Sequence, residues 1–294
     1  MIPLTVQAFE DQAPRGRALA AELGAPFAPI ALHRFPDGEL MPVVQPARTV
    51  VAYCSLDHPN EKLIALLLAA DAWRRAGVRR LVLVAPYLCY LRQDAVFHPG
   101  EPLSRDAVCG LLGACFDRVV TVDAHLHRTR DLSAAFGGIE ADDLSASIPL
   151  AEALAGPERP LVVGPDAESG PWAGRIAERL GGEALMFSKT RKGDETVRLA
   201  HSDLTSVWGR HVLLVDDICS SGATLVAAAE RLHAAGAASI DVGVVHALFG
   251  REAGARMKAA GVRAIVSTDS IVHPTNRAPL AGVLAAALQS EIQA

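Results

Sequence analysis

Short apolar runs rich in β-branched residues alternate with alanine-rich amphipathic stretches along most of the chain. Many of these runs are apolar at every position, which is typical of strands buried on both faces of a sheet. Helices are expected between them, for example at 61–77 and at 223–236, where Gly236 marks the end of the second. The alternation predicts an α/β fold with mostly parallel sheets flanked by helices. The expected strands are LTVQAF, RTVVAYCSL, RRLVLVAPY, DRVVTVDAH, PLVVGPDA, EALMFSKTR, HVLLVDDI, IDVGVVHAL and RAIVSTDS.

The pattern of strands and helices runs twice along the chain. The first series ends near DRVVTVDAH, a break follows around ADDLSASIPL, and the second series starts at RPLVVGPDA. A length of 294 residues also favours about two domains. We therefore expect tandem domains at residues 1–146 and 147–275, followed by a C-terminal helix at 276–294. Nothing in the sequence indicates on which half that helix packs.

Composition excludes several classes of protein. Hydrophobic residues make up 50% of the chain and charged residues 21%, so a globular protein with a substantial core is expected. The net charge of −5 argues against nucleic-acid binding, which needs a basic surface. The five cysteines form no Cys-x-x-Cys pair and favour reduced thiols in the cytoplasm. The N-terminus has no signal-peptide pattern, and Asp71 and Pro86 interrupt the long apolar runs, so no membrane span is expected.

The stretch VLLVDDICSSGATL, residues 212–225, has the features of an anion site. A buried strand at 212–215 is followed by small residues and then by a helix expected from Thr224 onward. Free backbone N–H groups at a helix start bind phosphate, and Gly222 lets the phosphate come close to the backbone. The hydroxyls of Ser220, Ser221 and Thr224 add donors. No lysine follows the glycine, so this is not a Walker-type loop.

Two adjacent acids, Asp216 and Asp217, lie between that strand and the small residues. Their carboxylates can accept hydrogen bonds from sugar hydroxyls and can help to hold a hydrated Mg²⁺ ion. Without a ligand, their proximity should raise the pKa of one of them. The alternative is an ordinary strand–turn–helix in which Asp217 or Ser220 caps the helix.

The stretch 212–225 resembles the phosphoribosyl-diphosphate binding loop of the type I phosphoribosyltransferase fold. Three further segments occur in a fixed order before it: RFPDGEL at 34–40, PYLCYLRQDAVFHPGEPLS at 86–104 followed by DRVVTVDAHLHRT, and MFSKTRKGD at 186–194. Together they resemble the ribose-phosphate diphosphokinases, which make phosphoribosyl diphosphate (PRPP synthetases). The RQD and PGEPLS motifs resemble those of the archaeal-type enzymes more closely than those of the bacterial and animal enzymes. The resemblance implies two phosphoribosyltransferase-like domains.

The resemblance implies an ATP site with contributions from two segments. Phe35, Asp37 and Glu39 match the adenine-binding loop, which in this family comes from a neighbouring subunit. Phe35 would stack on the base, and the two acids would recognise its exocyclic amine by hydrogen bonds. Arg92 and Gln93 match the ATP-binding Arg-Gln pair. The chain is therefore expected to form a homo-oligomer, at least a dimer; taken alone, an Asp-Gly turn would indicate only a hairpin.

The resemblance also implies metal-binding and catalytic residues. Asp123 and His125 match the Asp-x-His after a strand of the first half, and Asp166 matches the aspartate that contacts the ribose and a second metal ion. Lys189 and Arg191 match the Lys-x-Arg of the catalytic loop. Taken alone, a strand-end histidine or a basic loop would have no special function. The ribose 5-phosphate site would comprise Asp216, Asp217, Ser220, Ser221, Gly222 and Thr224.

The implied activity is the Mg²⁺-dependent transfer of diphosphate from ATP to the 1-hydroxyl of ribose 5-phosphate, giving 5-phosphoribosyl 1-diphosphate and AMP. The alternatives are a salvage phosphoribosyltransferase and a non-catalytic, nucleotide-binding regulatory homologue. Some residues depart from the family pattern. Ala95 and Val96 replace basic residues, Ala167 and Glu168 stand where a glycine pair is common, and the phosphate loop reads SSGAT. No allosteric phosphate or ADP site can be matched.

Overall fold

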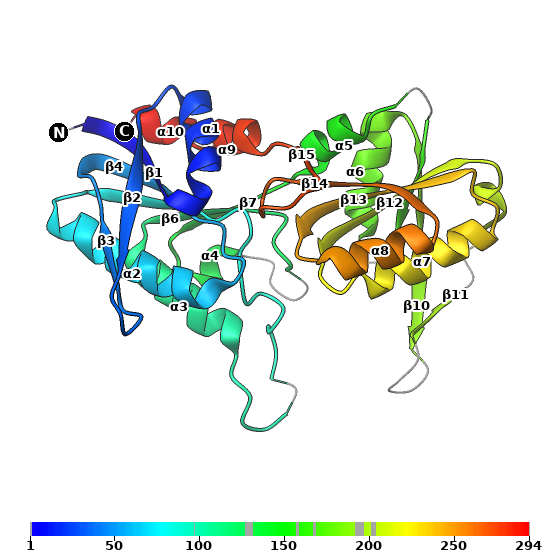
Figure 1. Ribbon diagram of the computed structural model, residues 1–294, viewed down its shortest axis with the longest axis horizontal. Helices are drawn as coiled ribbons and strands as arrows, with labels where there is room; N and C mark the ends of the chain where they lie inside the picture. Colours follow the sequence, from blue (N-terminus) through cyan, green and yellow to red (C-terminus); the bar gives the residue numbers. More distant parts are fainter. Residues whose placement is uncertain are drawn as a thin grey trace. The chain divides into compact units, whose positions relative to one another are not determined.

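The computed structural model describes residues 2–96, 98–126, 132–156, 159–166, 169–191, 197–200 and 204–293, with the backbone alone for Pro171, 188–191, 197–200 and Gln293. It divides into two compact units. Unit 1 comprises Met1–Leu144 together with Leu280–Ala294, and unit 2 comprises Ser145–Pro279. Each unit is a sheet with helices on both faces (Figure 1).

Unit 1 is built on a seven-stranded sheet with the order β3-β2-β1-β4-β5-β6-β7. All neighbouring strands are parallel except β2 and β3, which form an antiparallel hairpin. The strands are β1 (Ile2–Phe9), β2 (Phe27–Arg34), β3 (Leu40–Val43), β4 (Ala47–Tyr53), β5 (Arg80–Val84), β6 (Arg118–Val122) and β7 (Glu140–Leu144).

Helices cover both faces of the unit 1 sheet (Figure 1). One face carries α1 (Ala13–Leu23), which follows the short 3₁₀ helix η1 (Glu10–Gln12), together with α9 (Ala281–Ala287) and α10 (Gln289–Gln293). The other carries α2 (Pro59–Arg75) and α3 (Ser104–Cys115), and α4 (Leu132–Ala135) lies next to α3. Trp73 of α2 is fully buried in the core against the strands. The C-terminal segment therefore belongs to unit 1, which the sequence alone did not indicate.

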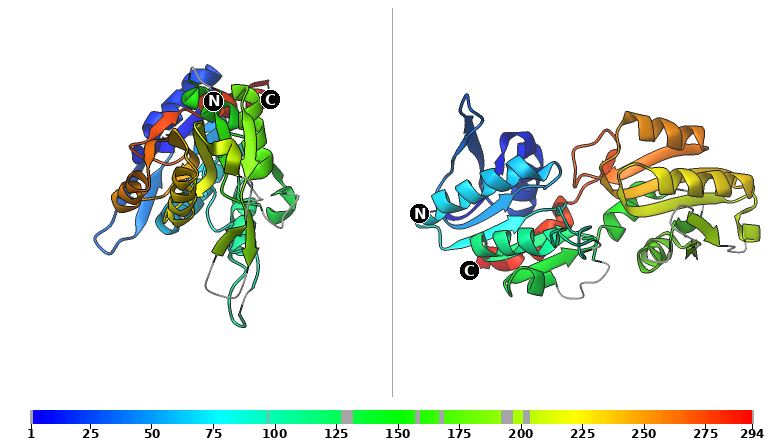
Figure 2. Two further views of the ribbon diagram at one scale, coloured as in Figure 1. Left: turned by 90° about the vertical axis from the view of Figure 1, so that its right-hand side faces the viewer. Right: turned by 90° about the horizontal axis from the view of Figure 1, so that it is seen from below.

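Unit 2 is built on a six-stranded parallel sheet with the order β15-β14-β13-β12-β8-β9. The strands are β8 (Leu161–Gly164), β9 (Glu183–Met186), β12 (His211–Cys219), β13 (Ser239–Ala247), β14 (Val262–Thr268) and β15 (Asn276–Ala278). A separate antiparallel pair comprises β10 (Ser188–Arg191) and β11 (Val197–Ala200). The helices are α5 (Ser147–Leu154) and α6 (Gly170–Leu180) on one face, and α7 (Ala223–Ala234) and α8 (Arg251–Ala259) on the other, with η2 (Leu204–Val207) before β12 (Figure 2).

The residues of β12 explain why the apolar runs predict parallel sheets. Val212 and Leu214 belong to the core beneath α7, while Leu213 and Val215 point to the opposite face, and all four are buried. A strand buried on both faces cannot alternate apolar and polar residues. The α/β fold with parallel-rich sheets in two domains, predicted from the sequence, is confirmed.

Two segments differ from the expectation. Residues 276–294 do not form one helix: β15 joins the unit 2 sheet, Pro279 follows it, and two short helices meet at Leu288. Proline cannot donate a hydrogen bond to a preceding turn, so the helix begins only after it. The expected strand at 183–191 is two strands, because the buried Phe187 lies between β9 and β10, which belong to different sheets. Within the described residues, no helix is long and apolar enough to cross a membrane.

Candidate active site

The loop after β12 in unit 2 is open at the start of α7. The strand continues through Asp216 and Asp217 to Cys219, and α7 begins at Ala223. Its N-cap is Gly222, in the left-handed conformation with φ of 74°, and the Ser221 hydroxyl accepts a long hydrogen bond from the Ala223 N–H at 3.4 Å. Gly222, and neither Asp217 nor Ser220, therefore occupies the N-cap position. Backbone N–H groups at the first turn of α7 are available to an anion.

The carboxylates of Asp216 and Asp217 are half-buried at the carboxyl end of β12. The Oδ1 atom of Asp217 accepts a hydrogen bond from the Ile218 N–H at 2.7 Å, and Oδ1 of Asp216 accepts one from the Asp217 N–H at 3.1 Å. Burial raises the pKa of Asp216 well above its usual value of 3.8, and the nearby charges of Asp217 and Asp166 raise it further. The direction agrees with the rise expected from the proximity of the two acids, and burial is the larger cause.

Asp166 follows β8, the neighbour of β12 in the sheet. Its Oδ1 atom accepts a hydrogen bond from the Ser169 N–H at 3.1 Å, and the Ser169 hydroxyl donates to the Asp166 carbonyl at 2.7 Å. A Cβ atom on Gly164 would lie 2.4 Å from the Ser169 hydroxyl oxygen, so this turn is tightly packed. The departures Ala167 and Glu168 lie outside the described residues.

The loop after β6 in unit 1 carries Asp123 and His125. Asp123 has a positive φ of 40°, which is unfavourable for a residue with a side chain and is held by its neighbours. Its N–H donates to the Leu144 carbonyl at 2.7 Å, and the next N–H, of Ala124, donates to Asp143 at 2.8 Å. The end of β7 therefore fixes the backbone that presents Asp123 and His125.

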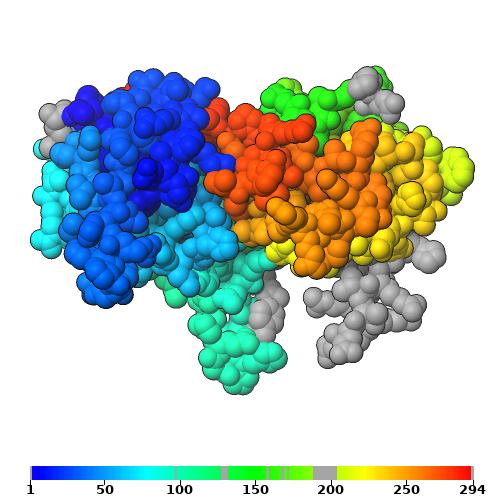
Figure 3. Space-filling model, in the orientation of Figure 1, coloured from blue at the N-terminus to red at the C-terminus, as the bar shows by residue number. Residues whose placement is uncertain are grey.

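The hairpin β2–β3 carries Phe35, Asp37 and Glu39 at its tip, where it stands out from unit 1 in blue (Figure 3). The turn is closed by the Phe35 N–H donating to the Glu39 carbonyl at 2.9 Å, and Oδ1 of Asp37 accepts from the Glu39 N–H at 3.2 Å. The Phe35 ring is 37% exposed and meets the His33 ring edge-on at 4.6 Å. An aromatic face and two carboxylates are thus displayed together on a protruding arm.

Arg92 and Gln93 lie in the long connection between β5 and α3 and are exposed. The buried Leu91 anchors this connection, and the Gln93 carbonyl accepts a hydrogen bond from the Arg105 N–H at 3.3 Å, which ties it to the first turn of α3. The backbone of Lys189 and Arg191 lies in β10, opposite Leu199 and Val197 of β11. The side chains of this predicted catalytic pair lie outside the described part of the structure.

The predicted residues therefore fall into two sets. Unit 2 brings Asp166, Asp216 and Asp217 close together beside the loop at 220–224. Unit 1 carries the segments matched to ATP and the Asp-x-His loop. Among the described residues, no group of three or more His, Cys, Asp or Glu side chains could by itself hold a metal ion.

One contact at the loop was missed by the sequence analysis. Nη2 of Arg256, on α8, donates a hydrogen bond to the Ser221 carbonyl at 2.8 Å. The two residues are 35 positions apart, so no local pattern indicates the contact. A basic residue in the last turn of a helix is ordinary in itself, because it complements the helix dipole.

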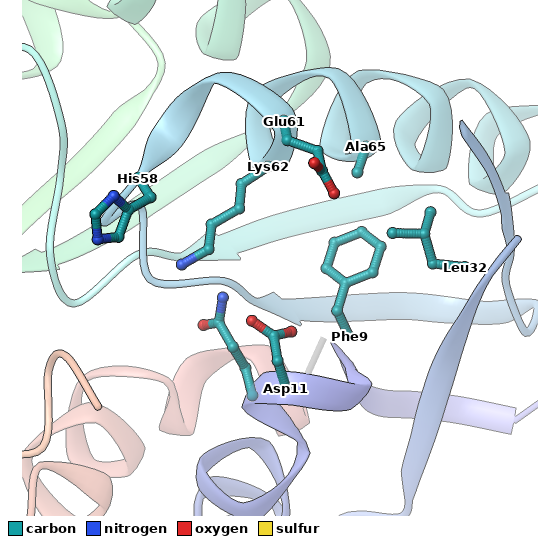
Figure 4. Close-up of a pocket in the computed structure, with 8 residues that line it drawn as sticks. Phe9, Asp11, Leu32, His58, Glu61, Lys62 and Ala65 are labelled. Carbon is teal, nitrogen blue, oxygen red and sulfur yellow. The ribbon is translucent and has the colours of Figure 1, made fainter. Parts of the chain in front are cut away.

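A pocket of about 330 Å³ lies elsewhere in unit 1, between the carboxyl ends of β1 and β2 and the start of α2 (Figure 4). Phe9, Asp11, Glu61 and Lys62 are among its lining residues. The Lys62 ammonium donates to Asp57 at 2.7 Å and to the Ser55 carbonyl at 2.9 Å, and Glu61 pairs with Arg34. These charges are compensated within the protein, and none of the predicted site residues described by the structure lines the pocket.

Comparisons with known proteins agree with these observations. The N-terminal domain model of ribose phosphate pyrophosphokinase matches residues 5–115, and the phosphoribosyl transferase domain model matches residues 138–277. The ribose-phosphate pyrophosphokinase of Methanopyrus kandleri is 35% identical over 281 residues, covering 94% of this chain and 95% of the relative. That of Pyrococcus abyssi is 36% identical over 247 residues, covering 81% and 84%.

The fold has also been seen in a solved structure. The crystal structure of phosphoribosylpyrophosphate synthetase from Mycobacterium smegmatis superposes with a TM-score of 0.83 at 24% identity, covering 99% of both chains. The sequence relatives span nearly the whole of this chain, and both domain models match in the order of the two units. The chain therefore belongs to the ribose-phosphate pyrophosphokinase family of enzymes, as the order of its motifs led us to expect.

Proposed function

We propose that the protein transfers the diphosphoryl group of ATP to the 1-hydroxyl of ribose 5-phosphate, giving 5-phosphoribosyl 1-diphosphate and AMP. The observation that carries this proposal is the loop at 220–222, which places a helix start with glycine at its N-cap shortly after two half-buried carboxylates. The five free cysteines fit a reducing compartment, and we propose a cytoplasmic enzyme.

The loop in unit 2 is suited to the sugar phosphate. Residues 220–224 would hold the 5-phosphate through backbone N–H groups and hydroxyls, because a helix start attracts anions. Asp216 and Asp217 would accept hydrogen bonds from the ring hydroxyls. The raised pKa of Asp216 supports this role, since donors from the sugar would relieve the repulsion that the carboxylate meets without a ligand.

The chemistry of the acidic groups fits Mg²⁺, which prefers oxygen ligands and keeps several waters. Asp166, Asp216 and Asp217 place oxygen ligands beside the loop, although their spacing does not make a complete site. Asp123 and His125 of unit 1 would contact one ion and Asp166 of unit 2 a second, each together with substrate oxygens. When bound, Mg²⁺ would supply positive charge that offsets the negative charge of the ATP phosphates.

The ATP side would be formed by exposed groups of unit 1. The Phe35 ring would stack on adenine, Asp37 and Glu39 would accept hydrogen bonds from the exocyclic amine, and Arg92 and Gln93 would contact the phosphates. We propose that the hairpin serves the site of a neighbouring subunit, so that the working form is a homo-oligomer, at least a dimer. The protrusion of the hairpin supports this arrangement.

The reaction needs positioning and charge stabilisation more than a covalent intermediate. The 1-hydroxyl would attack the β-phosphorus of ATP in line with the leaving AMP oxygen. Lys189 and Arg191 would bind the transferring group and stabilise the charge that develops on it. This scheme assigns each cluster of predicted residues one task.

One assay separates the proposal from its alternatives. The protein is incubated with ATP, Mg²⁺ and ribose 5-phosphate without a nucleobase, and AMP is measured. AMP formation that depends on ribose 5-phosphate supports the proposal. Pyrophosphate release only with phosphoribosyl diphosphate and a nucleobase would identify a salvage transferase, and inactivity in both assays would leave a regulatory homologue.

A further inference from the structure

Helix α8 packs against one side of the loop at 220–222. A Cβ atom on Gly222 would lie 3.4 Å from the Cβ atom of Ala253 and 3.7 Å from the Cε atom of Met257, and both of these residues are buried. The loop therefore rests on an apolar part of α8. Arg256 lies on the same helix and reaches the loop with its guanidinium group, 2.8 Å from the Ser221 carbonyl oxygen.

This contact fixes the orientation of one peptide unit. The carbonyl of Ser221 and the N–H of Gly222 belong to the same planar trans peptide and point in opposite directions. Since Arg256 draws the carbonyl towards α8, the Gly222 N–H points away from α8. That N–H is thereby aimed to the side from which an anion can approach the start of α7.

The opposite orientation of this peptide is open to the chain without Arg256. Gly222 has φ of 74° and ψ of 0°, and glycine adopts left- and right-handed conformations about equally well. Type I and type II β-turns differ mainly by a flip of their central peptide. A flipped peptide would place the Ser221 carbonyl oxygen where the phosphate binds, and the two negative groups would repel each other.

We propose that Arg256 is a positioning residue for the sugar phosphate, which it serves by holding the Ser221–Gly222 peptide with its N–H towards the 5-phosphate. The proposal rests on the proposed function of residues 220–224. Arg256 acts through the backbone and does not itself contact the phosphate. Its ion pair with Glu252, at 3.1 Å, lies on the surface and contributes little to holding the guanidinium, because exposed pairs are weak.

The test compares Arg256→Met and Arg256→Lys with the wild type. Methionine keeps an unbranched apolar stem and loses all the donors, whereas lysine keeps one charged donor group. The matched control is Arg263→Met, which removes an exposed arginine that pairs with Asp241 near the amino ends of β13 and β14. Melting temperatures of all variants show whether each one folds.

We expect Arg256→Met to raise the KM for ribose 5-phosphate about fivefold, since the guanidinium is half-exposed and a typical hydrogen bond is worth about that factor. The KM for ATP and the kcat should change less than about twofold, and Arg256→Lys should recover part of the loss. The Arg263→Met control should keep both KM values. A role limited to folding would lower the melting temperature and leave the ratio of the two KM values unchanged, and this outcome would overturn the proposal.

Direct binding separates this proposal from the proposed function. Calorimetry of ribose 5-phosphate with wild type and Arg256→Met needs no turnover. If the wild type binds the sugar phosphate but forms no AMP, the proposed reaction fails, and the role of Arg256 is still decided by the ratio of the two dissociation constants. Equal dissociation constants would overturn the role of Arg256 alone. No binding by the wild type would overturn both.

Discussion

The Glu291 carboxylate accepts a hydrogen bond from Arg118, with Nη1 of Arg118 3.0 Å from Oε1 of Glu291. Glu291 lies on α10 and Arg118 at the start of β6, 173 positions earlier in the chain. Arg80, at the start of β5, donates to the same carboxylate from two nitrogens at 2.8 Å. The last helix is therefore held at the amino ends of two central strands, at the end of the sheet opposite the ligand-binding ends.

Replacing Glu291 with alanine should destabilise unit 1. The side chain is 2% exposed, so its loss leaves two partly buried guanidinium groups without their shared partner. Arg80 keeps Glu140 and Arg118 keeps Asp142, which limits the cost to about 2–3 kcal/mol. Denaturant unfolding measures it, with the exposed Glu140→Ala as the control, for which we expect less than about 1 kcal/mol. Equal losses in the two variants would contradict this role of Glu291.

The same carboxylate should make unit 1 sensitive to acid. Burial alone would raise the pKa of Glu291, but hydrogen bonds from Arg80 and Arg118 outweigh burial and hold the pKa below its usual value of 4.5. A lowered pKa in the folded state gives stability that is fully present above pH 4.5 and is lost as the pH falls through the folded-state value. The difference in unfolding free energy between the wild type and Glu291→Gln should therefore shrink below pH 4.5. A difference independent of pH would contradict this assignment.

Asp216 should lower the stability of the folded protein and support the binding of ribose 5-phosphate. Burial first, then Asp217 and Asp166, raise the pKa of Asp216 above 3.8, so the folded protein retains a proton that the unfolded chain releases. Stability then falls as the pH rises above 3.8, and the loss persists at neutral pH. Asp216→Asn should raise the melting temperature at pH 7 and raise the KM for ribose 5-phosphate roughly tenfold or more. Asp71→Asn on the exposed surface of α2 is the control, and a lower melting temperature in Asp216→Asn would refute the argument.

The sequence predicted those parts of the fold that depend on local patterns. Runs such as 212–215 can be buried only in a sheet covered on both faces, so the α/β fold followed from them. Strand β7, EADDL, was missed because it is an edge strand whose acids are exposed or half-buried. Glu140 and Asp142 of this strand pair with Arg80 and Arg118, and no local pattern can show such partners.

The candidate site was predictable to a similar extent. The strand, acid pair and small residues at 212–224 indicated an anion site from physical chemistry alone, and the structure adds that Gly222 is the N-cap of the helix. Arg256 was missed because its partner is a backbone carbonyl 35 positions away. The roles of Phe35, Lys189 and Arg191 came from family resemblance, since an exposed aromatic ring or a basic pair has no distinctive local signature.

Lys189→Ala should abolish most of the turnover. A preorganised cation that stabilises the transferring group typically contributes on the order of 10²–10³ in kcat. The loop at 220–224 is untouched by this change, so binding of ribose 5-phosphate measured by calorimetry should stay within about twofold of the wild type. Lys258→Ala, on the exposed side of α8, is the control and should keep full activity. Unchanged turnover in Lys189→Ala would remove this residue from the proposed mechanism.

Phe35→Ala should weaken ATP binding and reveal whether the hairpin serves a neighbouring subunit. Stacking of a base on an aromatic ring is worth about 1–3 kcal/mol, so the KM for ATP should rise about tenfold or more. If the hairpin works in the neighbouring site, mixed oligomers of Phe35→Ala and Lys189→Ala subunits contain sites with an intact hairpin from one subunit and an intact Lys189 from the other. Co-expression should then give more activity than the sum of the two variants alone. Mixing Phe35→Ala with the double variant provides the control, because no site regains both residues. If activity in the first mixture only equals the sum, the hairpin serves its own subunit.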